Sequence, residues 1–143
     1  MIYTTNTRKA MEIAYKAHQG QVDKSGVPYI FHPIHLAEQM ETEEECIVAL
    51  LHDVVEDTEV TFEQLAEIFS DTIIEALKLL THDDSVEYFH YIVNIRDCKN
   101  DIAKKVKLAD LKHNSDIRRI GSMTPEMLKR VAKYQSAIKI LSE

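Results

Sequence analysis

The sequence has few of the residues that mark disorder, disulfide frameworks or membrane spans. Its 143 residues include only three glycines and three prolines, which argues against a linker-rich or low-complexity chain. The two cysteines, Cys46 and Cys98, form no CxxC pattern, so a disulfide framework is excluded. The longest apolar run is far shorter than the roughly 18 residues of a membrane span, and the N-terminus lacks a signal peptide's apolar core. We therefore expect one cytoplasmic domain.

Positive charge is missing from a long part of the chain. Residues 25–77 contain no Lys or Arg and thirteen Asp or Glu, whereas residues 99–143 contain eleven basic and five acidic residues. An acidic half suits a cation and a basic half suits an anion. The alternative is that these are solvated helix faces that happen to segregate. The net charge of −7 argues against a nucleic-acid groove, so we expect no nucleic-acid partner. The short apolar runs likewise lead us to expect no membrane partner.

Strict alternation of apolar and polar residues is absent, and apolar residues repeat with helical spacing nearly everywhere. The sequence therefore predicts an all-α fold, a single compact bundle of about eight helices. Thr42 with Glu45 and Thr61 with Gln64 are capping boxes. The expected helices span residues 5–19, 62–69, 72–80, 86–99, 102–113 and 125–141, with a short helix after Pro33 and a buried one from Thr42 through HDVVED.

One stretch joins an apolar run directly to charge. The six apolar residues Cys46–Leu51 lead into His52, Asp53, Glu56 and Asp57. Buried charge is costly unless it is compensated, and a bound metal is a common compensation. On one continuous helix, Glu56 lies one turn beyond His52, and Asp57 one turn beyond Asp53. Imidazole and carboxylate groups together suit a divalent ion such as manganese, iron or zinc.

Two residues elsewhere in the chain accompany this stretch. His32 precedes Pro33 at the end of the irregular loop that contains Gly20 and Gly26. Asp110 lies between apolar residues of an expected helix, which is the same kind of anomaly as Asp53. A second His-Asp pair, His82–Asp83, follows a helix end and is interpreted as structural, with Asp83 or Ser85 capping the next helix. The remaining histidines are also interpreted as structural rather than as ligands: His18, His35, His90 and His113.

This combination matches a known metal signature. An isolated histidine, a His-Asp pair and a later aspartate are the signature of the HD superfamily of phosphohydrolases, which the chain resembles. The blocks AHQGQVDKSGVPYIFHP, LLHDVVEDT and VKLADLKHN resemble the three signature blocks of the hydrolase domain of RelA/SpoT homologues, in the same order and similarly spaced. The resemblance implies an HD-domain helical bundle over residues 1–143, with no synthetase or regulatory domain.

The resemblance also implies a function. It implies an enzyme of the stringent response, a stand-alone manganese-dependent hydrolase that removes the 3′-pyrophosphate from the nucleotide alarmones ppGpp and pppGpp. Phosphate-ester hydrolysis is slow enough to need both a nucleophile and neutralised phosphate charge, and a metal supplies both. The matching residues imply metal ligation by His32, His52, Asp53 and Asp110, action at the attacking water by Glu56 and Asp57, and substrate contacts from Lys24, Ser25 and Asn114.

Three positions depart from that family. Asp23 stands where alarmone hydrolases usually carry a basic residue that lies against the guanine base. Asp116 and Ile117 stand where the family often has Arg and Thr near the nucleotide. The metal signature is therefore retained while the pocket has changed, which fits an altered substrate preference as well as retained alarmone hydrolysis.

The sequence leaves three functions open. The first is the alarmone hydrolase, and the second is an HD phosphohydrolase of another nucleotide, such as a nucleoside monophosphate or NADPH, which Asp23 favours. The third is a metal-dependent nucleotide sensor or partner-binding module without turnover, against which the intact Glu56 and Asp57 argue. The apolar stripe of the last helix suits either a homo-oligomer interface or the chain's own core.

Overall fold

The computed structural model describes residues 1–143 as nine α-helices and one 3₁₀ helix. Their bounds are α1 (Thr5–Ala17), α2 (Phe31–Glu38), α3 (Glu43–Leu51), α4 (Val54–Asp57), α5 (Phe62–Ala66), α6 (Asp71–Leu80), α7 (Tyr88–Asp97), α8 (Asp101–Asn114), η1 (Ile117–Arg119) and α9 (Pro125–Leu141). The only β-type contact is an isolated bridge between Val22 and Pro28, so the all-α prediction is confirmed. No helix combines the length and the apolar character that a bilayer crossing requires.

Capping hydrogen bonds fix where several helices begin. The side chain of Thr42 accepts from the backbone N–H of Glu45, whose side chain accepts in return from the Thr42 N–H, and Thr61 pairs with Gln64 in the same way. At α9, the Thr124 side chain accepts from the N–H of Met127 and a proline occupies the first helical position. All three predicted helix starts are confirmed.

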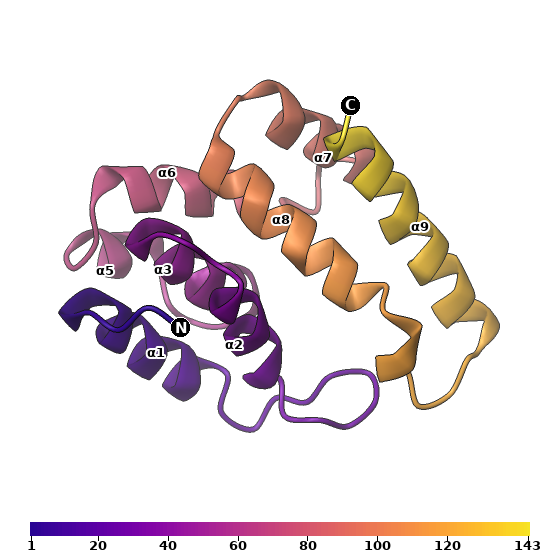
Figure 1. Ribbon diagram of the computed structural model, residues 1–143, viewed down its shortest axis with the longest axis horizontal. Coiled ribbons are helices and arrows are strands. Elements are labelled where there is room, and N and C mark those ends of the chain that lie inside the picture. Colours follow the sequence, from indigo (N-terminus) through magenta and orange to yellow (C-terminus); the bar gives the residue numbers. More distant parts are fainter.

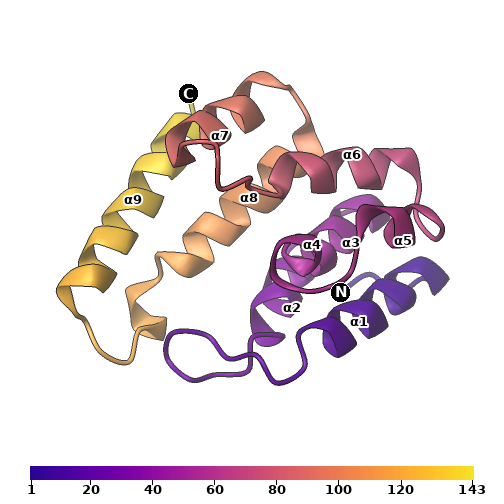
Figure 2. The ribbon, with the colours of Figure 1, turned by 180° about the vertical axis from the view of Figure 1, so that it is seen from behind.

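The central helix of the bundle is α3. Its residues Cys46–Leu51 are all fully buried, and it packs against α1, α2, α6 and α8. Figures 1 and 2 show α8 crossing the molecule between this group of helices and a second group, in which α9 runs alongside α8 and α7 lies near one end. The loop between α1 and α2 extends beside the end of α8 and η1 (Figure 1).

The continuous helix expected through HDVVED is broken. Helix α3 ends at Leu51, His52 is its C-cap, and α4 begins at Val54. Asp53 has φ −108° and ψ 0°, in the sparsely populated bridge region between helix and strand conformations. The prediction of one uninterrupted helix was therefore wrong, and His52 and Asp53 lie at a junction rather than on a regular helical face.

Helix α2 also differs from the expectation, since it begins at Phe31 and not after Pro33. Proline is tolerated here because the N–H groups of a helix's first turn have no intrahelical acceptor. The earlier start places His32 in the first turn of α2, where its side chain is buried. This position on α2 directs the His32 side chain toward His52, Asp53 and Asp110.

Candidate metal centre and active site

Four side chains from three parts of the chain converge beside α3. His32 comes from α2, His52 and Asp53 come from the α3–α4 junction, and Asp110 comes from α8. One potential ligand atom of each lies within 4.8 Å of the others. The Nε2 atom of His32 is 2.9 Å from Asp110 Oδ1, and Nε2 of His52 is 3.0 Å from Asp53 Oδ2. The structure thus brings together the four residues expected to bind metal.

The hydrogen bond made by His52 leaves its other nitrogen facing carboxylates. Its Nδ1 lies 2.7 Å from the carbonyl oxygen of Ala49, to which only an N–H can donate. In a neutral imidazole the Nε2 atom then carries a lone pair, and this atom is buried without a hydrogen-bond partner. Burial lowers the pKa of His52, but Asp53 and Asp110 raise it, and the resulting pKa is well above the ordinary value for histidine. The cluster therefore favours positive charge at this point.

The chemistry of the donor set fits a divalent metal. Two imidazole nitrogens and two carboxylates suit manganese, iron or zinc, and a cation would give the lone pair of His52 and the facing carboxylate oxygens a common partner. Asp53 is available as a carboxylate. Burial raises its pKa, but the opposing effect of His52 is larger and brings the pKa down to about 2. The hydroxyl of Tyr29 donates to Asp53 Oδ2 and fixes the orientation of this carboxylate.

A second histidine, His113, contacts the ring nitrogen of His32 that does not face Asp110. Nδ1 of His113 lies 2.7 Å from Nδ1 of His32, and the two rings are nearly parallel. Burial and the nearby Arg119 lower the pKa of His113 to about 3, so its ring is neutral and its Nδ1 can accept a hydrogen bond. If Nε2 of His32 binds metal, its Nδ1–H donates to His113, as the outer hydrogen bonds of ligating histidines commonly do. This contact could not be predicted from the sequence, in which 81 positions separate the two histidines.

Asp110 is held by two residues of its own helix. Its Oδ1 accepts from Asn114 Nδ2 at 2.9 Å, and its Oδ2 accepts from Lys107 Nζ at 2.8 Å. Burial opposes ionisation of Asp110, but Lys107 and His32 hold its pKa well below the ordinary value. Asn114 was expected to contact substrate. Its side chain contacts Asp110 and also lines the neighbouring cavities, so a substrate contact stays a prediction.

Glu56 and Asp57 lie on α4, at the exposed side of the cluster. Each places a carboxylate oxygen near Asp53, with one oxygen of each of the three residues within 4.8 Å of the others. Burial of the carboxyl groups and the charge of Asp53 raise the pKa of both. Glu56 Oε1 also accepts a 2.7 Å hydrogen bond from the backbone N–H of His82. The two carboxylates expected at the attacking water are thus beside the metal cluster and open to solvent.

The second His-Asp pair lies outside the metal cluster. The His82 ring stacks on Tyr91 with centroids 4.7 Å apart, and its Nε2 is 2.7 Å from the Val86 carbonyl oxygen. Neither Asp83 nor Ser85 caps the next helix. The N-cap of α7 is Glu87, whose side chain accepts from the N–H of His90.

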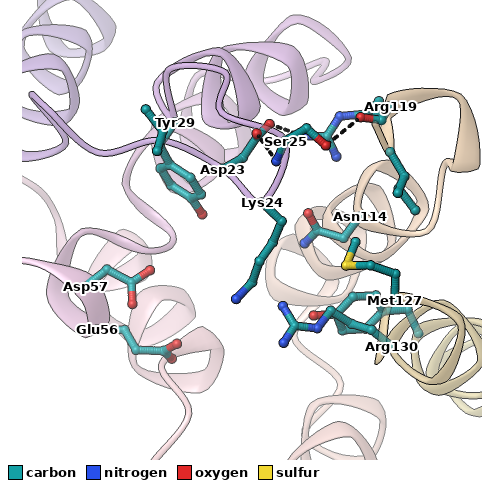
Figure 3. A pocket seen from close by; sticks show the side chains of 13 residues that line it. Asp23, Lys24, Ser25, Tyr29, Glu56, Asp57, Asn114, Arg119, Met127 and Arg130 are labelled. Atoms are coloured by element: carbon teal, nitrogen blue, oxygen red, sulfur yellow. Dashed lines mark hydrogen bonds and ion pairs between the residues drawn. The ribbon is translucent and has the colours of Figure 1, made fainter. Parts of the chain in front are cut away.

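Two adjoining cavities open beside the cluster. The larger, of about 670 Å³, is lined by the α1–α2 loop, α4, the end of α8 and α9. The smaller, of about 190 Å³, is bordered by Asp53 and Asp110 of the metal cluster. Figure 3 shows Lys24 extending into the larger cavity between the carboxylates of α4 on one side and Arg130 of α9 on the other. The larger cavity therefore has an acidic end and a basic side.

The contribution of α9 was missed by the sequence analysis. Arg130, Met127 and Tyr134 line the larger cavity. Tyr134 belongs to the apolar stripe of the last helix, for which the sequence predicts only a core or an association face, and another member of the stripe, Leu128, is 56% exposed. Arg130 lies one turn before Tyr134 on α9, and this arginine beside an aromatic residue of the stripe is the signal that could have indicated a binding face.

Asp23 and Ser25 serve to clamp the loop in this structure. The Asp23 carboxylate accepts from the N–H groups of Ser25 and Val27 and lies 3.4 Å from Arg119 Nη2. The Ser25 hydroxyl donates to the Arg119 carbonyl oxygen and accepts from the Gly121 N–H, both at 3.1 Å. Figure 3 shows this contact at the rim of the larger cavity. The substrate contact expected of Ser25 stays a prediction, because its hydroxyl already has two protein partners.

The other two departures lie away from the cavities. Asp116 caps η1 and forms a 2.8 Å ion pair with Arg118, while Ile117 is 59% exposed. Neither lines the larger or the smaller cavity. In this structure, only Asp23 of the three departures lines the larger cavity.

Comparisons with known proteins place these features in context. A family model described as "HD domain" matches residues 10–123. The chain is 39% identical over 137 residues to a guanosine-3′,5′-bis(diphosphate) 3′-pyrophosphohydrolase of Haemophilus influenzae, a match that covers 85% of this chain and 20% of that protein. It is 34% identical over 140 residues to the enzyme of the same name from zebrafish, Danio rerio, covering 88% of this chain and 76% of that protein.

Two further comparisons concern SpoT. The bifunctional (p)ppGpp synthase/hydrolase SpoT of Escherichia coli is 32% identical over 146 residues, covering 88% of this chain and 20% of that protein. The chain thus spans only about a fifth of the two bacterial relatives. A solved structure, described as a metazoan orthologue of SpoT that hydrolyses ppGpp, matches 99% of this chain and 88% of its own with a TM-score of 0.77 at 24% identity. This match establishes the fold.

Proposed function

The chain belongs to the HD domain family, and from this premise we propose that it is a metal-dependent pyrophosphohydrolase that converts ppGpp and pppGpp to GDP and GTP plus pyrophosphate. One observation carries the proposal. The cluster of His32, His52, Asp53 and Asp110 lies beside two further carboxylates, Glu56 and Asp57, and these line a cavity with basic residues on its other side. Relatives named for this reaction support the choice of substrate.

The four clustered side chains are the proposed metal ligands, and manganese is the proposed ion. When bound, a divalent ion supplies Lewis-acid polarisation of a phosphoryl oxygen and lowers the pKa of a water molecule. The protein holds the ligands in place through contacts already formed: Ala49 orients His52, His113 orients His32, and Tyr29 orients Asp53.

We assign proton transfer to the carboxylates of α4. Glu56 or Asp57 accepts a proton from the attacking water, and the other orients that water. Their raised pKa values bring their basicity closer to neutral pH, which improves a general base. The hydrogen bond from the His82 N–H fixes one oxygen of Glu56 and leaves the other for this task.

We assign nucleotide binding to the larger cavity. Lys24 extends into it from the α1–α2 loop and Arg130 from α9, and both would neutralise phosphate charge, Lys24 as a point charge and Arg130 through its planar guanidinium. Asn114, at the boundary between the two cavities, would contact the ribose or a phosphate. A substrate of this kind is consistent with a cytoplasmic location.

Pyrophosphate release by the manganese-loaded protein tests the proposal. The panel contains ppGpp, pppGpp, NADPH and simple nucleotides, with Asp53→Ala as the control. We expect pyrophosphate from ppGpp and pppGpp, and none above background from the control. If the protein binds manganese and nucleotide but hydrolyses no member of the panel, an enzymatic function would be contradicted and a sensor supported.

A second candidate, a phosphohydrolase of another nucleotide, is favoured by one contact. Asp23 pairs with Arg119 at the cavity rim, so this loop position presents no free positive charge to a base. Release of phosphate from NADPH or a nucleoside monophosphate, without turnover of ppGpp, would establish this alternative.

A further inference from the structure

Lys107 belongs to the third signature block, VKLADLKHN, but neither the roles implied by the resemblance nor the proposed mechanism uses it. It is the only lysine or arginine lining the smaller cavity, whose wall also carries the carboxylates of Asp53, Glu56, Asp57 and Asp110. Its side chain is only 13% exposed. A phosphate group that enters this cavity meets four carboxylates, so it needs positive charge from the protein as well as from a metal.

The ammonium group of Lys107 is fixed in position but retains capacity for a ligand. Of its three N–H donors, one is directed to Asp110 Oδ2 at 2.8 Å. The nitrogen also lies 5.2 Å from the centroid of the Tyr91 ring, an electrostatically favourable arrangement. That ring is immobilised because its hydroxyl donates to the Leu80 carbonyl oxygen at 2.6 Å.

The two cavities present separate cations. Lys24 and Arg130 line the larger cavity, and Lys107 lines the smaller one next to the metal cluster. A nucleotide with phosphates at two positions of the ribose would need both sets: one for the phosphates that stay on the product and one for the group that leaves.

We infer that Lys107 is a phosphate-binding residue, and that its ammonium contacts an oxygen of the phosphoryl group entering the smaller cavity beside the metal cluster. This inference rests on the proposed function, because it assigns the leaving pyrophosphate to that cavity. It differs from a role confined to orienting Asp110. A residue that only orients Asp110 affects metal binding, whereas a phosphate ligand affects pyrophosphate binding after the metal is in place.

Calorimetry on three variants separates these roles. The variants are Lys107→Met, Lys107→Arg and, as the matched control, Lys105→Met. Lys105 lies on the same helix, but its ammonium pairs with Glu41 and Glu45 away from the site. Manganese is titrated first, and inorganic pyrophosphate is then titrated into manganese-loaded protein freed of excess metal. Thermal unfolding confirms that each variant is folded.

We expect Lys107→Met to bind manganese no more weakly than the wild type, since a neighbouring positive charge is removed. Its affinity for pyrophosphate should fall at least about tenfold, the effect of losing one charge-assisted hydrogen bond. Lys107→Arg should recover part of that loss, and Lys105→Met should match the wild type in both titrations.

Three results would overturn the inference: unchanged pyrophosphate affinity in Lys107→Met, a loss that follows a matching loss of manganese affinity, or no pyrophosphate binding by the wild type. The experiment does not depend on which nucleotide is hydrolysed. A wild type that binds pyrophosphate through Lys107 but does not turn over ppGpp would contradict the proposed function and leave the inference standing.

Discussion

The two walls of the site are built in different ways. The metal-cluster wall comes from α2, the α3–α4 junction and α8, where His32, His52 and Asp110 are buried among apolar residues. The nucleotide wall comes from the α1–α2 loop, η1 and α9, where Lys24 is exposed and Arg130 is half-buried. A polar group on the first wall must have a partner, because its burial is costly, whereas a polar group on the second can also be satisfied by water. We therefore expect changes to the first wall to abolish chemistry and changes to the second to alter affinity.

The largest effect is expected from Asp53→Ala. It removes a carboxylate of the metal cluster, and we expect kcat/KM for pyrophosphate release to fall by about a thousandfold or more, with loss of manganese affinity. Asp53 is partly exposed, so the fold should survive, which circular dichroism would verify. A variant that keeps more than about a tenth of the wild-type activity would show that this wall is not the catalytic one.

A smaller loss is expected from Glu56→Gln. Glutamine keeps an oxygen that can accept from the His82 N–H, but it cannot accept a proton from water. We expect kcat to fall about a hundredfold while KM changes less than about threefold. Steady-state kinetics measure both. An unchanged kcat would transfer the role of base to Asp57, and the Asp57→Asn variant would then show the loss.

On the nucleotide wall, Arg130→Ala should change binding rather than chemistry. We expect KM to rise about tenfold, kcat to change less than about threefold, and manganese affinity to stay the same. Lys129→Ala is the control, because Lys129 is exposed on the same helix and lines neither cavity. If Arg130→Ala lost manganese binding as well, the separation of the two walls would be wrong.

The smallest effect concerns the start of α3, at the opposite end of this helix from His52. Burial opposes the charge of Glu45, but the N–H groups of Glu41 and Thr42 and the ammonium of Lys105 lower its pKa below the ordinary value. Its stabilising contribution is complete above the ordinary carboxyl pKa and is lost as pH falls through the lowered one.

The free energy of unfolding of wild type and Glu45→Gln should therefore differ by less than about 1 kcal/mol at neutral pH. The difference should shrink as pH falls below the ordinary carboxyl pKa. Urea denaturation at several pH values measures it. A difference independent of pH would mean that Glu45 acts through its uncharged hydrogen bonds alone.

The features that could be predicted from the sequence are those that depend on local hydrogen bonds or on the cost of burying charge. Helix starts such as those capped by Thr42 and Thr61 depend on local hydrogen bonds, and these were predicted correctly. Charged residues beside or inside apolar runs identified His52, Asp53 and Asp110 as members of the metal-cluster wall, because such residues are costly without a partner. The resemblance to a known family added His32 and supplied the roles.

Other features depend on tertiary contacts and could not be read from spacing. The break at Asp53 interrupts a pattern that favours one helix. Arg119 pairs with Asp23, and His113 contacts His32, although more than eighty residues separate the members of each pair. Arg130 and Lys107 are basic residues of the kind that usually lie on solvated helix faces. Only the packing of α8 and α9 turns them toward the cavities.

The clamp at Ser25 has a consequence for the order of folding. Its hydroxyl joins residues 94 positions apart in the chain, and its bond from Gly121 spans 96 positions. Contacts of such long sequence separation form only after a large loop has been closed, so they are expected late in folding. A folding intermediate with α1–α3 already assembled would therefore lack the rim of the larger cavity, and nucleotide binding would report the last stage of the folding reaction.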